Sequence, residues 1–482
     1  MYKYLSIYQK KKIWRLEREF SIISKKFVNN QLEEWWFHEI SRLDFRPWGG
    51  LNTEDYLSID LNLKNFIKSF IKDFILIFFF FIKNIFGSNY KKYLSKNVLL
   101  IEDVVWNKKS AKNFFFKSID QKVKKKKILI LSFFHFNKKN VVTLSDITSN
   151  NEKFYYIFRS ILSILIIFLQ ILKLKKKGKI SNFWINFFFL KSSLKKIYLN
   201  FLIYNYAKNN KFCENLIFPY EEKTFERAVL SGIKDQQNIN KLKTFAVCIN
   251  PQHHLASFLK TFKGLNIPRS YRYLYCGKFY RNYFNKLDRE NILSLNNKDC
   301  IGSAKSHIQY TKINIKNKSI LLLLSHIDEL KEIIFYLQTE KKLTNFKFIL
   351  RPYPHAPTTY EIKNLINNSN INNILISNDK LINDIKKCGF VVFSGTSAGI
   401  ECINLGRIGI WCNLSNVGIN PLFDHVEFFF PSLNSKQFYK NLNLVYNMNN
   451  SAYKKKLKFQ QKICQKIYSR INIKLINKYF NS

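Results

Sequence analysis

Strands and helices alternate along residues 319–413, and this alternation restricts the chain to an α/β fold more strictly than any other feature. Short runs such as SILLLL and FVVF have the length and the apolar content of buried strands. The intervening segments, such as IDELKEIIFYLQTEKK, carry apolar residues at helical spacing. Because strands that alternate with helices form parallel sheets covered on both faces, this segment predicts a doubly wound unit.

The preceding part of the chain shows the same alternation less regularly. Strands are predicted at residues 97–105, 127–136, 244–250 and 273–277. Residues 1 to about 95 carry aromatic side chains at helical spacing and predict helices instead. The last segment, residues 453–479, predicts a single basic amphipathic helix.

The net charge of +46 does not by itself indicate a nucleic-acid-binding protein. The lysines occur in nearly every segment and form no single stripe, and no nucleic-acid module signature is present. The charge and the 16% aromatic content instead predict attraction to anionic lipid headgroups. The eight cysteines include no C-x-x-C pair, which argues against zinc ribbons and favours a reducing cytosol.

Two apolar stretches have the composition of membrane segments. Residues 74–82 are too few to span a bilayer. Residues 154–172 approach the required length, but Arg159 and Gln170 interrupt them, so a buried or interfacial helix is favoured over a span. The N-terminus lacks the apolar core of a secretion signal.

The segment from Gly389 to Trp411 has the pattern of a phosphate-binding strand, loop and helix. A buried strand ends at a loop formed by Ser394, Gly395, Thr396 and Ser397, and the following helix stops at Gly406. Backbone N–H groups and hydroxyls at such a loop suit a phosphate. Glu401 follows Ser397 by one helical turn, where its carboxylate is placed to bind a ribose. Each feature alone is also compatible with an ordinary βα turn.

Two further strand ends are expected on the same edge of this sheet. His326 follows one strand, and Arg351 and His355 follow the next in RPYPHAP. Ligands bind beyond the carboxyl ends of parallel strands, so these side chains are predicted to join the loop in one nucleotide site. An arginine and an imidazole suit a nucleotide phosphate, although RPYPHAP alone is equally compatible with a rigid turn. A structural role as a polar residue at a strand end is favoured for His326 alone.

The N-terminal half offers candidates for a general base. If the chemistry is sugar transfer, this half must supply a group that removes a proton from the acceptor hydroxyl. Glu221 is the first candidate and His135 the second, while His253 ends a strand of the same half and is the third. Structural roles, at a helix start or in a hydrogen-bonded turn, are open for all three.

Residues 319–413 resemble the nucleotide-sugar-binding domain of GT-B glycosyltransferases. The order WWFHEISRLDF, FPYEEKTFERAV, PQHH, RPYPH and SGTSAGIE is similar to that of bacterial surface carbohydrate biosynthesis proteins for lipopolysaccharide, O-antigen or related glycans. The resemblance implies that residues 394–397 hold phosphate, Glu401 the ribose, and Arg351 and His355 the donor phosphates. The chain departs from the family in having Pro-Tyr-Pro-His in place of His-Pro, and in lacking a glycine-rich loop after residues 127–136.

These observations together predict a GT-B-like α/β fold of two doubly wound Rossmann-like domains with a central cleft. The predicted divisions are a helical extension (1–95), an acceptor domain with an inserted apolar helix near 154–172 (96–312), a nucleotide-sugar-binding domain (313–450) and a helix that returns to the acceptor domain (451–482).

The predicted activity is metal-independent sugar transfer from a nucleotide-sugar donor to a surface-glycan precursor of lipopolysaccharide, O-antigen or capsule, either a free glycan or a lipid-linked one. No cofactor and no nucleic-acid partner are expected. The expected location is the cytoplasm, peripheral on the inner face of the bacterial inner membrane. The alternatives are a UDP-sugar 2-epimerase and a non-catalytic scaffold of a glycan assembly complex.

Overall fold

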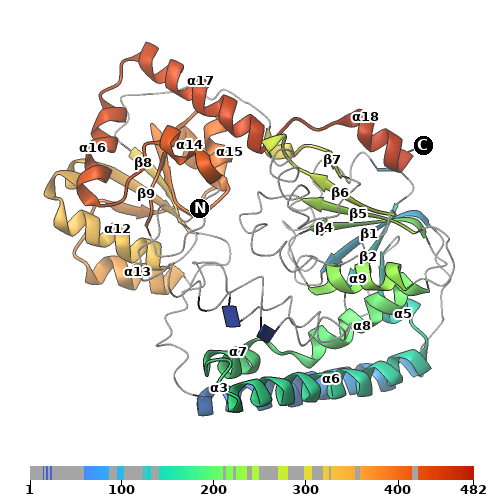
Figure 1. Ribbon diagram of the computed structural model, residues 1–482. Helices are drawn as coiled ribbons and strands as arrows, with labels where there is room; N and C mark the ends of the chain where they lie inside the picture. The colour runs from blue at the N-terminus through green and yellow to red at the C-terminus, as the bar shows by residue number, and fades with distance from the viewer. Residues whose placement is uncertain are drawn as a thin grey trace.

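The computed structural model shows two parallel β-sheets with helices around them (Figure 1). It describes residues 15, 18–19, 22–23, 59–85, 95–102, 123–124, 126–131, 141–209, 213–220, 224–235, 242–248, 270–279, 298–306, 319–324, 327–352, 359–414 and 422–481.

The N-terminal sheet has seven strands, all parallel, in the order β3-β2-β1-β4-β5-β6-β7. They are β1 (Ser95–Glu102), β2 (Lys126–Leu131), β3 (Val141–Thr143), β4 (Cys213–Tyr220), β5 (Lys243–Cys248), β6 (Tyr271–Tyr275) and β7 (Lys298–Cys300). The order reverses direction between β1 and β4, which is the arrangement of a doubly wound Rossmann-like sheet.

The C-terminal sheet has five parallel strands in the order β10-β9-β8-β11-β12. They are β8 (Ser319–Leu323), β9 (Lys347–Arg351), β10 (Ile374–Ile376), β11 (Phe390–Phe393) and β12 (Ile408–Trp411). Its direction reverses between β8 and β11. The predicted fold class, α/β with two doubly wound Rossmann-like sheets, is therefore confirmed.

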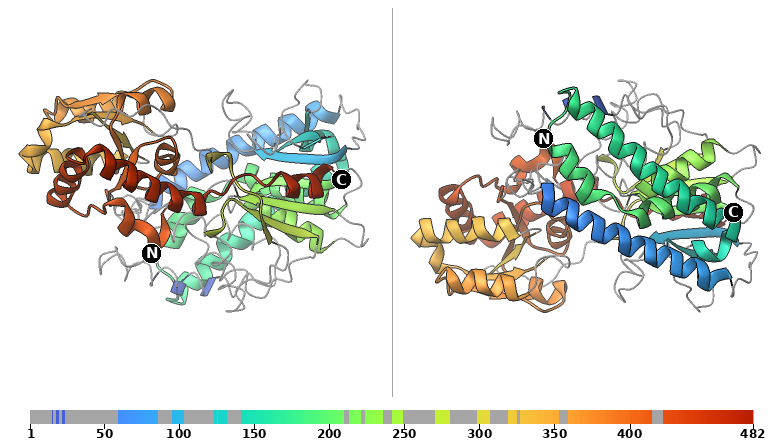
Figure 2. Two further views of the ribbon diagram at one scale, coloured as in Figure 1. Left: turned by 90° about the horizontal axis from the view of Figure 1, so that it is seen from above. Right: turned by 90° about the horizontal axis from the view of Figure 1, so that it is seen from below.

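The helices connect these strands and flank the sheets (Figures 1 and 2). The α-helices are α3 (Ile59–Ile85), α5 (Leu144–Ile147), α6 (Asn150–Lys176), α7 (Phe183–Lys191), α8 (Leu194–Lys208), α9 (Thr224–Lys234), α12 (Ile327–Thr339), α13 (Thr359–Asn368), α14 (Leu381–Lys387), α15 (Ala398–Asn404), α16 (Ser435–Tyr446), α17 (Asn450–Ile467) and α18 (Ile473–Ile476). Short 3-10 helices are η3 (Ala304–Ser306), η4 (Lys341–Asn345) and η5 (Phe423–Phe429), and η6 (Asn477–Asn481) is a π-helix.

The C-terminal end of the chain covers one face of the N-terminal sheet. Alternate residues of a strand point to opposite faces, and Leu99 and Phe245 share a buried cluster with Ile476 and Phe480. Phe480 is 1% exposed, and its carbonyl accepts a hydrogen bond of 3.0 Å from the buried amide of Asn97. Helices α8 and α9 lie on the other side of this sheet in Figure 1.

The prediction of one continuous helix over residues 453–479 is wrong. The helix α17 ends at Ile467, and the chain is not helical again until α18 begins at Ile473. Between them Ser469 donates its N–H to the carbonyl of Cys276 (2.9 Å), and its own carbonyl accepts from the N–H of Ser303 (2.9 Å). Bonds to the ends of β6 and β7 therefore replace the helical bonds of this segment.

The helices α3 and α6 expose a continuous row of apolar side chains, which we call the α3–α6 apolar face. Both helices lie at the bottom of Figure 1, and the view from below in Figure 2 shows them on one face of the molecule. The face consists of Leu63, Ile67, Ile71, Phe74, Ile75, Phe78, Phe79 and Ile82 on α3 and Phe154, Tyr155, Phe158, Leu162, Leu165, Leu169 and Leu172 on α6. Within the described parts of the chain, α6 is the one helix that is long and apolar enough to cross a membrane.

Candidate functional site

The loop after β11 is held tightly against its own strand. Residues 390–393 are at most 1% exposed, and the strand leads directly into Ser394–Ser397 and then α15. A Cβ on Gly399 would overlap the ring of Phe393, so the first turn of α15 lies directly on the strand. Gly406 has a φ of +101° and follows the helix end, as predicted for its C-terminal stop.

This loop lies at the point where the strand order of the C-terminal sheet reverses. Strands β8 and β11 are paired in parallel, so Leu323 and Phe393 are level at their carboxyl ends. In open parallel sheets, ligands bind in the crevice at this reversal point. The loop of residues 394–397 therefore occupies the position in the sheet where a nucleotide is expected.

The side chains of the loop differ in exposure and in partners. Ser394 and Thr396 are 4% and 8% exposed. The hydroxyl of Thr396 accepts a hydrogen bond of 3.2 Å from the N–H of Ala398, which fixes the start of α15. Ser397 is half-buried.

Lys305 is a residue of this site that sequence reasoning missed. It lies on η3, directly after the last strand of the N-terminal sheet, and its Nζ donates a hydrogen bond of 2.9 Å to Oγ of Ser397. The carbonyl of Lys305 accepts from Nδ2 of Asn404 on α15 (2.9 Å), so its backbone is also fixed to the second sheet's helix. Its ammonium is 5.5 Å from the ring centroid of Tyr468. The N-terminal half thus supplies a positive charge to the loop.

The sequence around Lys305 has no pattern that marks this residue as part of a site. It lies in Gly302-Ser303-Ala304-Lys305-Ser306, after a strand of three residues that is too short to stand out. Only the pairing of β7 with β6 and the contact with α15 bring this lysine to the loop.

Arg351 lies at the end of β9, as predicted, but its guanidinium has a structural partner. Its Nη1 donates a hydrogen bond of 2.8 Å to Oδ2 of Asp384 and one of 2.5 Å to the carbonyl of Asp379. The Asp384 side chain is 1% exposed, and its other oxygen accepts a hydrogen bond of 2.5 Å from Oγ of Ser377. A buried carboxylate is stable only when a cation and hydrogen-bond donors offset its loss of hydration. Arg351 therefore stabilises α14, which carries Asp384.

The position of Arg351 also separates it from the loop. Strand β8 lies between β9 and β11. Neighbouring strands are about 4.8 Å apart, so the two strand ends are separated by about 10 Å. The role of Arg351 in donor binding stays a prediction.

Glu401 lies in the first turn of α15 and is half-buried. Its backbone N–H donates a hydrogen bond of 3.4 Å to the carbonyl of Ser397, which places the two residues one turn apart as predicted. No hydrogen bond joins its carboxylate to any residue that the structure describes. A carboxylate in this state can accept hydrogen bonds from ribose hydroxyls.

The thiols that flank the loop are not suited to nucleophilic chemistry. Cys402 lies on α15, and the N–H of Cys412 donates a hydrogen bond of 3.0 Å to the carbonyl of Phe393. Burial raises the pKa of both thiols well above the usual range, so both remain neutral near pH 7. Among the residues that the structure describes, no three His, Cys, Asp or Glu side chains form a group that could hold a metal ion. The expected metal independence stays a prediction.

The remaining predicted site residues lie outside the described residues. They are His326 and His355 on the donor side and Glu221, His135 and His253 as candidates for the base. Of the predicted donor residues, the structure therefore unites residues 394–397 with Glu401, and it adds Lys305.

Comparison with known proteins adds no assignment. No protein-family model and no curated protein matches the chain. Among solved structures, the chain is similar to S. aureus TarM, solved with UDP, with 13% identity over 59% of each chain and a TM-score of 0.39. It is also similar to the pneumococcal O-GlcNAc transferase GtfA (11% identity, 58% of this chain and 59% of that chain, TM-score 0.40).

A third similar structure is WaaG, described as a glycosyltransferase involved in lipopolysaccharide biosynthesis, with 8% identity, 80% of this chain and 100% of that chain covered, and a TM-score of 0.37. The chain spans 59% of the length of TarM and GtfA. Likenesses at these TM-scores assign neither a family nor an activity to the chain.

Proposed function

We propose that the chain is a GT-B glycosyltransferase that transfers a sugar from a nucleotide-sugar donor to a surface-glycan precursor. The hydrogen bond between Lys305 and Ser397 is the observation that supports this most directly. It joins a positive charge from the N-terminal half to the loop at the reversal point of the C-terminal sheet. A phosphate between two Rossmann-like sheets would find both a cation and hydroxyl donors there.

Different residues of the site bind the phosphates and the ribose of the donor. The hydroxyl of Ser397 and the ammonium of Lys305 bind the donor phosphates, and Glu401 accepts hydrogen bonds from the ribose. Binding of a phosphate would replace the Lys305–Ser397 bond with two charge-assisted hydrogen bonds to the ligand. Lys305 then stabilises the negative charge that develops on the leaving nucleotide, without a metal ion.

The proposed reaction conserves atoms and charge. The bond from the anomeric carbon to the phosphate oxygen breaks, and its electron pair leaves with the nucleotide. A new bond forms from the acceptor oxygen to the anomeric carbon, and the hydroxyl proton passes to a base of the N-terminal half. Glu221 is the first candidate for that base, followed by His135 and His253.

The acceptor is proposed from the sequence resemblance to lipopolysaccharide, O-antigen and capsule biosynthesis proteins. It is a glycan precursor, free or lipid-linked, on the cytoplasmic face of a bacterial inner membrane. Contact with an anionic membrane follows from the basic and aromatic composition.

The donor site is tested by calorimetric titration with a panel of UDP, GDP, dTDP and CMP. We expect one of these nucleotides to bind the wild-type chain, and Lys305→Ala to weaken its binding about tenfold or more through loss of a charge-assisted bond. Lys342→Ala is the matched control, because Lys342 also lies near a tyrosine ring (5.7 Å from the centroid of Tyr439) but belongs to η4, before β9. Equal effects of the two substitutions would exclude Lys305 from the site.

The reaction is tested by incubation with the nucleotide sugars of the base that binds. Release of free nucleotide that depends on an added glycan acceptor supports transfer. Formation of an epimer without an acceptor would instead identify a UDP-sugar 2-epimerase, and no binding of any nucleotide or nucleotide sugar would favour a scaffold.

A further inference from the structure

The α3–α6 apolar face holds most of the exposed large apolar side chains in the part of the chain that the structure describes. Fifteen of the 21 found among the described residues belong to it, and several exceed half exposure, including Phe79 (60%), Phe158 (59%) and Leu169 (62%). Soluble monomers rarely expose contiguous apolar patches of more than a few hundred Å². This concentration on two neighbouring helices therefore indicates a surface that is covered by a partner.

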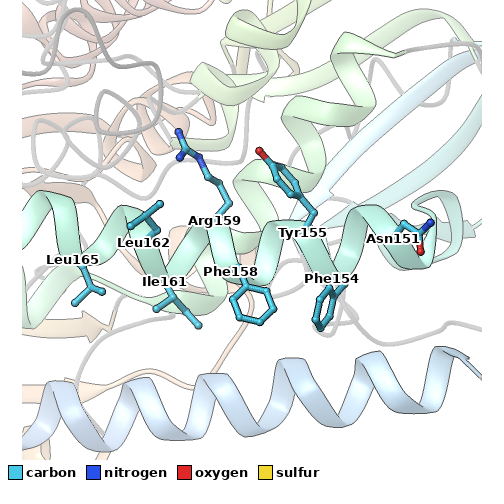
Figure 3. A pocket seen from close by; sticks show the side chains of 8 residues that line it. All are labelled: Asn151, Phe154, Tyr155, Phe158, Arg159, Ile161, Leu162 and Leu165. Carbon is cyan, nitrogen blue, oxygen red and sulfur yellow. The ribbon is translucent and has the colours of Figure 1, made fainter.

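The two helices lie side by side on one face of the molecule and contact each other. The rings of Phe81 on α3 and Phe154 on α6 have centroids 5.7 Å apart. An open groove of about 700 Å³ runs along α6, and the residues that line it all belong to this helix. Figure 3 shows Phe154, Phe158 and Leu165 projecting on the side of α6 that faces α3. Arg159 provides a positive charge at the edge of this groove.

Lysines border the apolar face. Lys64, Lys68 and Lys72 are exposed and each follows an apolar residue of the face by one position, so they form a parallel row along α3. The C-terminal end of α6 adds Lys173, Lys175 and Lys176. The acidic side chain of Asp73 is turned away from this surface, since it is buried and accepts hydrogen bonds from Oγ of Ser193 (2.8 Å) and the N–H of Lys195 (3.1 Å).

The opposite sides of both helices are packed into the protein. On α6, Tyr156, Ile164 and Ile171 are buried, and on α3 the ring of Phe66 is 5.5 Å from that of Phe188 on α7. Each helix has 27 residues and is therefore about 40 Å long. With one side packed, the two helices present an apolar strip to their surroundings.

We propose that the α3–α6 apolar face lies in the interface of an anionic lipid bilayer, with its lysines at the headgroup level. An apolar strip bordered by lysines is the pattern of helices that lie in the plane of a membrane. A symmetric dimer through this face would place identical lysine rows near each other, whereas anionic headgroups neutralise them. This inference rests on the membrane contact in the proposed function and names the surface that makes it.

The full-length chain tests the proposal by flotation with vesicles. We expect binding to vesicles of phosphatidylcholine with 30% phosphatidylglycerol, weaker binding at 0.5 M than at 0.1 M salt, and little binding to pure phosphatidylcholine. Hydrogen exchange should show protection of α3 and α6 on addition of the anionic vesicles, but not of α12 or α17. Absence of binding to the anionic vesicles would overturn the proposal.

A triple substitution with a matched control identifies the lysine row. The Lys64→Gln, Lys68→Gln, Lys72→Gln variant should lower the partition coefficient about tenfold or more. The control is the same change at the exposed residues 454, 458 and 462 of α17, which have the same spacing and lie at the top of Figure 1, away from α3 and α6. We expect the control to stay within twofold of wild type, and equal losses in both variants would refute the assigned surface.

The apolar residues are tested by Phe158→Glu, with Phe335→Glu on α12 as the control because the two rings are 59% and 54% exposed. Only the first should reduce vesicle binding. If sedimentation shows instead a dimer that Phe158→Glu dissociates, and vesicles do not bind, the face is an interface between copies. Nucleotide binding by the same variants is expected to be unchanged, which separates failure of this inference from failure of the donor site.

Discussion

Substitution of Arg351 by methionine distinguishes a structural from a donor-binding role for this arginine. The guanidinium makes an ion pair of 2.8 Å with Asp384, and the two side chains are 29% and 1% exposed. Removing one partner of a buried pair leaves an uncompensated charge, which costs about 3–5 kcal/mol. Because Arg351 is partly exposed, we expect the lower end, about 3 kcal/mol, for Arg351→Met.

Thermal unfolding measured by calorimetry and circular dichroism checks this value. For a unit of 150–250 residues, a loss of about 3 kcal/mol lowers Tm by roughly 6–12 °C. Lys387→Met is the control, because Lys387 lies on α14 with Asp384 but the side chains of the Lys387–Asp379 pair are 57% and 45% exposed. We expect no measurable change in Tm for the control.

A double-mutant cycle separates the two roles of Arg351. In Asp384→Asn the buried charge is gone, so adding Arg351→Met should cost about 2 kcal/mol less than it does in wild type. If Arg351 served only the donor, its substitution would leave Tm unchanged, weaken nucleotide binding, and show no coupling to Asp384. That result would refute the structural argument.

Three further outcomes are expected. Gly399→Ala should destabilise the protein by about 2 kcal/mol, measured by denaturant unfolding, because its Cβ would overlap the ring of Phe393; an unchanged midpoint would contradict the close contact. Phe480→Ala should cost about 3 kcal/mol in the same assay, since Phe480 is 1% exposed, whereas Ile473→Ala, at 53% exposure, should be close to neutral. The raised pKa of Cys388, about 12 through burial, means that its stabilising effect is complete below the unfolded pKa near 9 and is lost as pH rises toward 12. The free energy of unfolding should therefore fall between pH 9 and pH 11, and Cys388→Ala should flatten that fall.

Local pattern was sufficient for most of the C-terminal half. The expected strands at SILLLL and FVVF are β8 and β11, and the helix stop at Gly406 is confirmed. These elements depend on side-chain periodicity and backbone preference within a few residues, which a single sequence records. The same reasoning overestimated the length of the last helix. The hydrogen bonds of Ser469 with Cys276 and Ser303 end that helix, and both partners lie far from Ser469 in the chain.

The candidate site was predictable in part. The loop of residues 394–397 and Glu401 follow from the order of strand, loop and helix around them. Lys305 did not follow, because its approach to Ser397 depends on how the two sheets are placed relative to each other. The buried ion pair of Arg351 with Asp384 was missed for a similar reason, since 33 residues separate the two in the chain.

By itself, then, the sequence determined the α/β class, the elements of the C-terminal sheet and the loop of small residues between β11 and α15, because these arise from interactions between near neighbours. The tertiary structure alone decided three things: which lysine reaches that loop, which carboxylate engages Arg351, and which side of α6 remains exposed. Each depends on contacts between residues distant in the chain, and the free energy of such contacts is set by burial and geometry that periodicity does not encode.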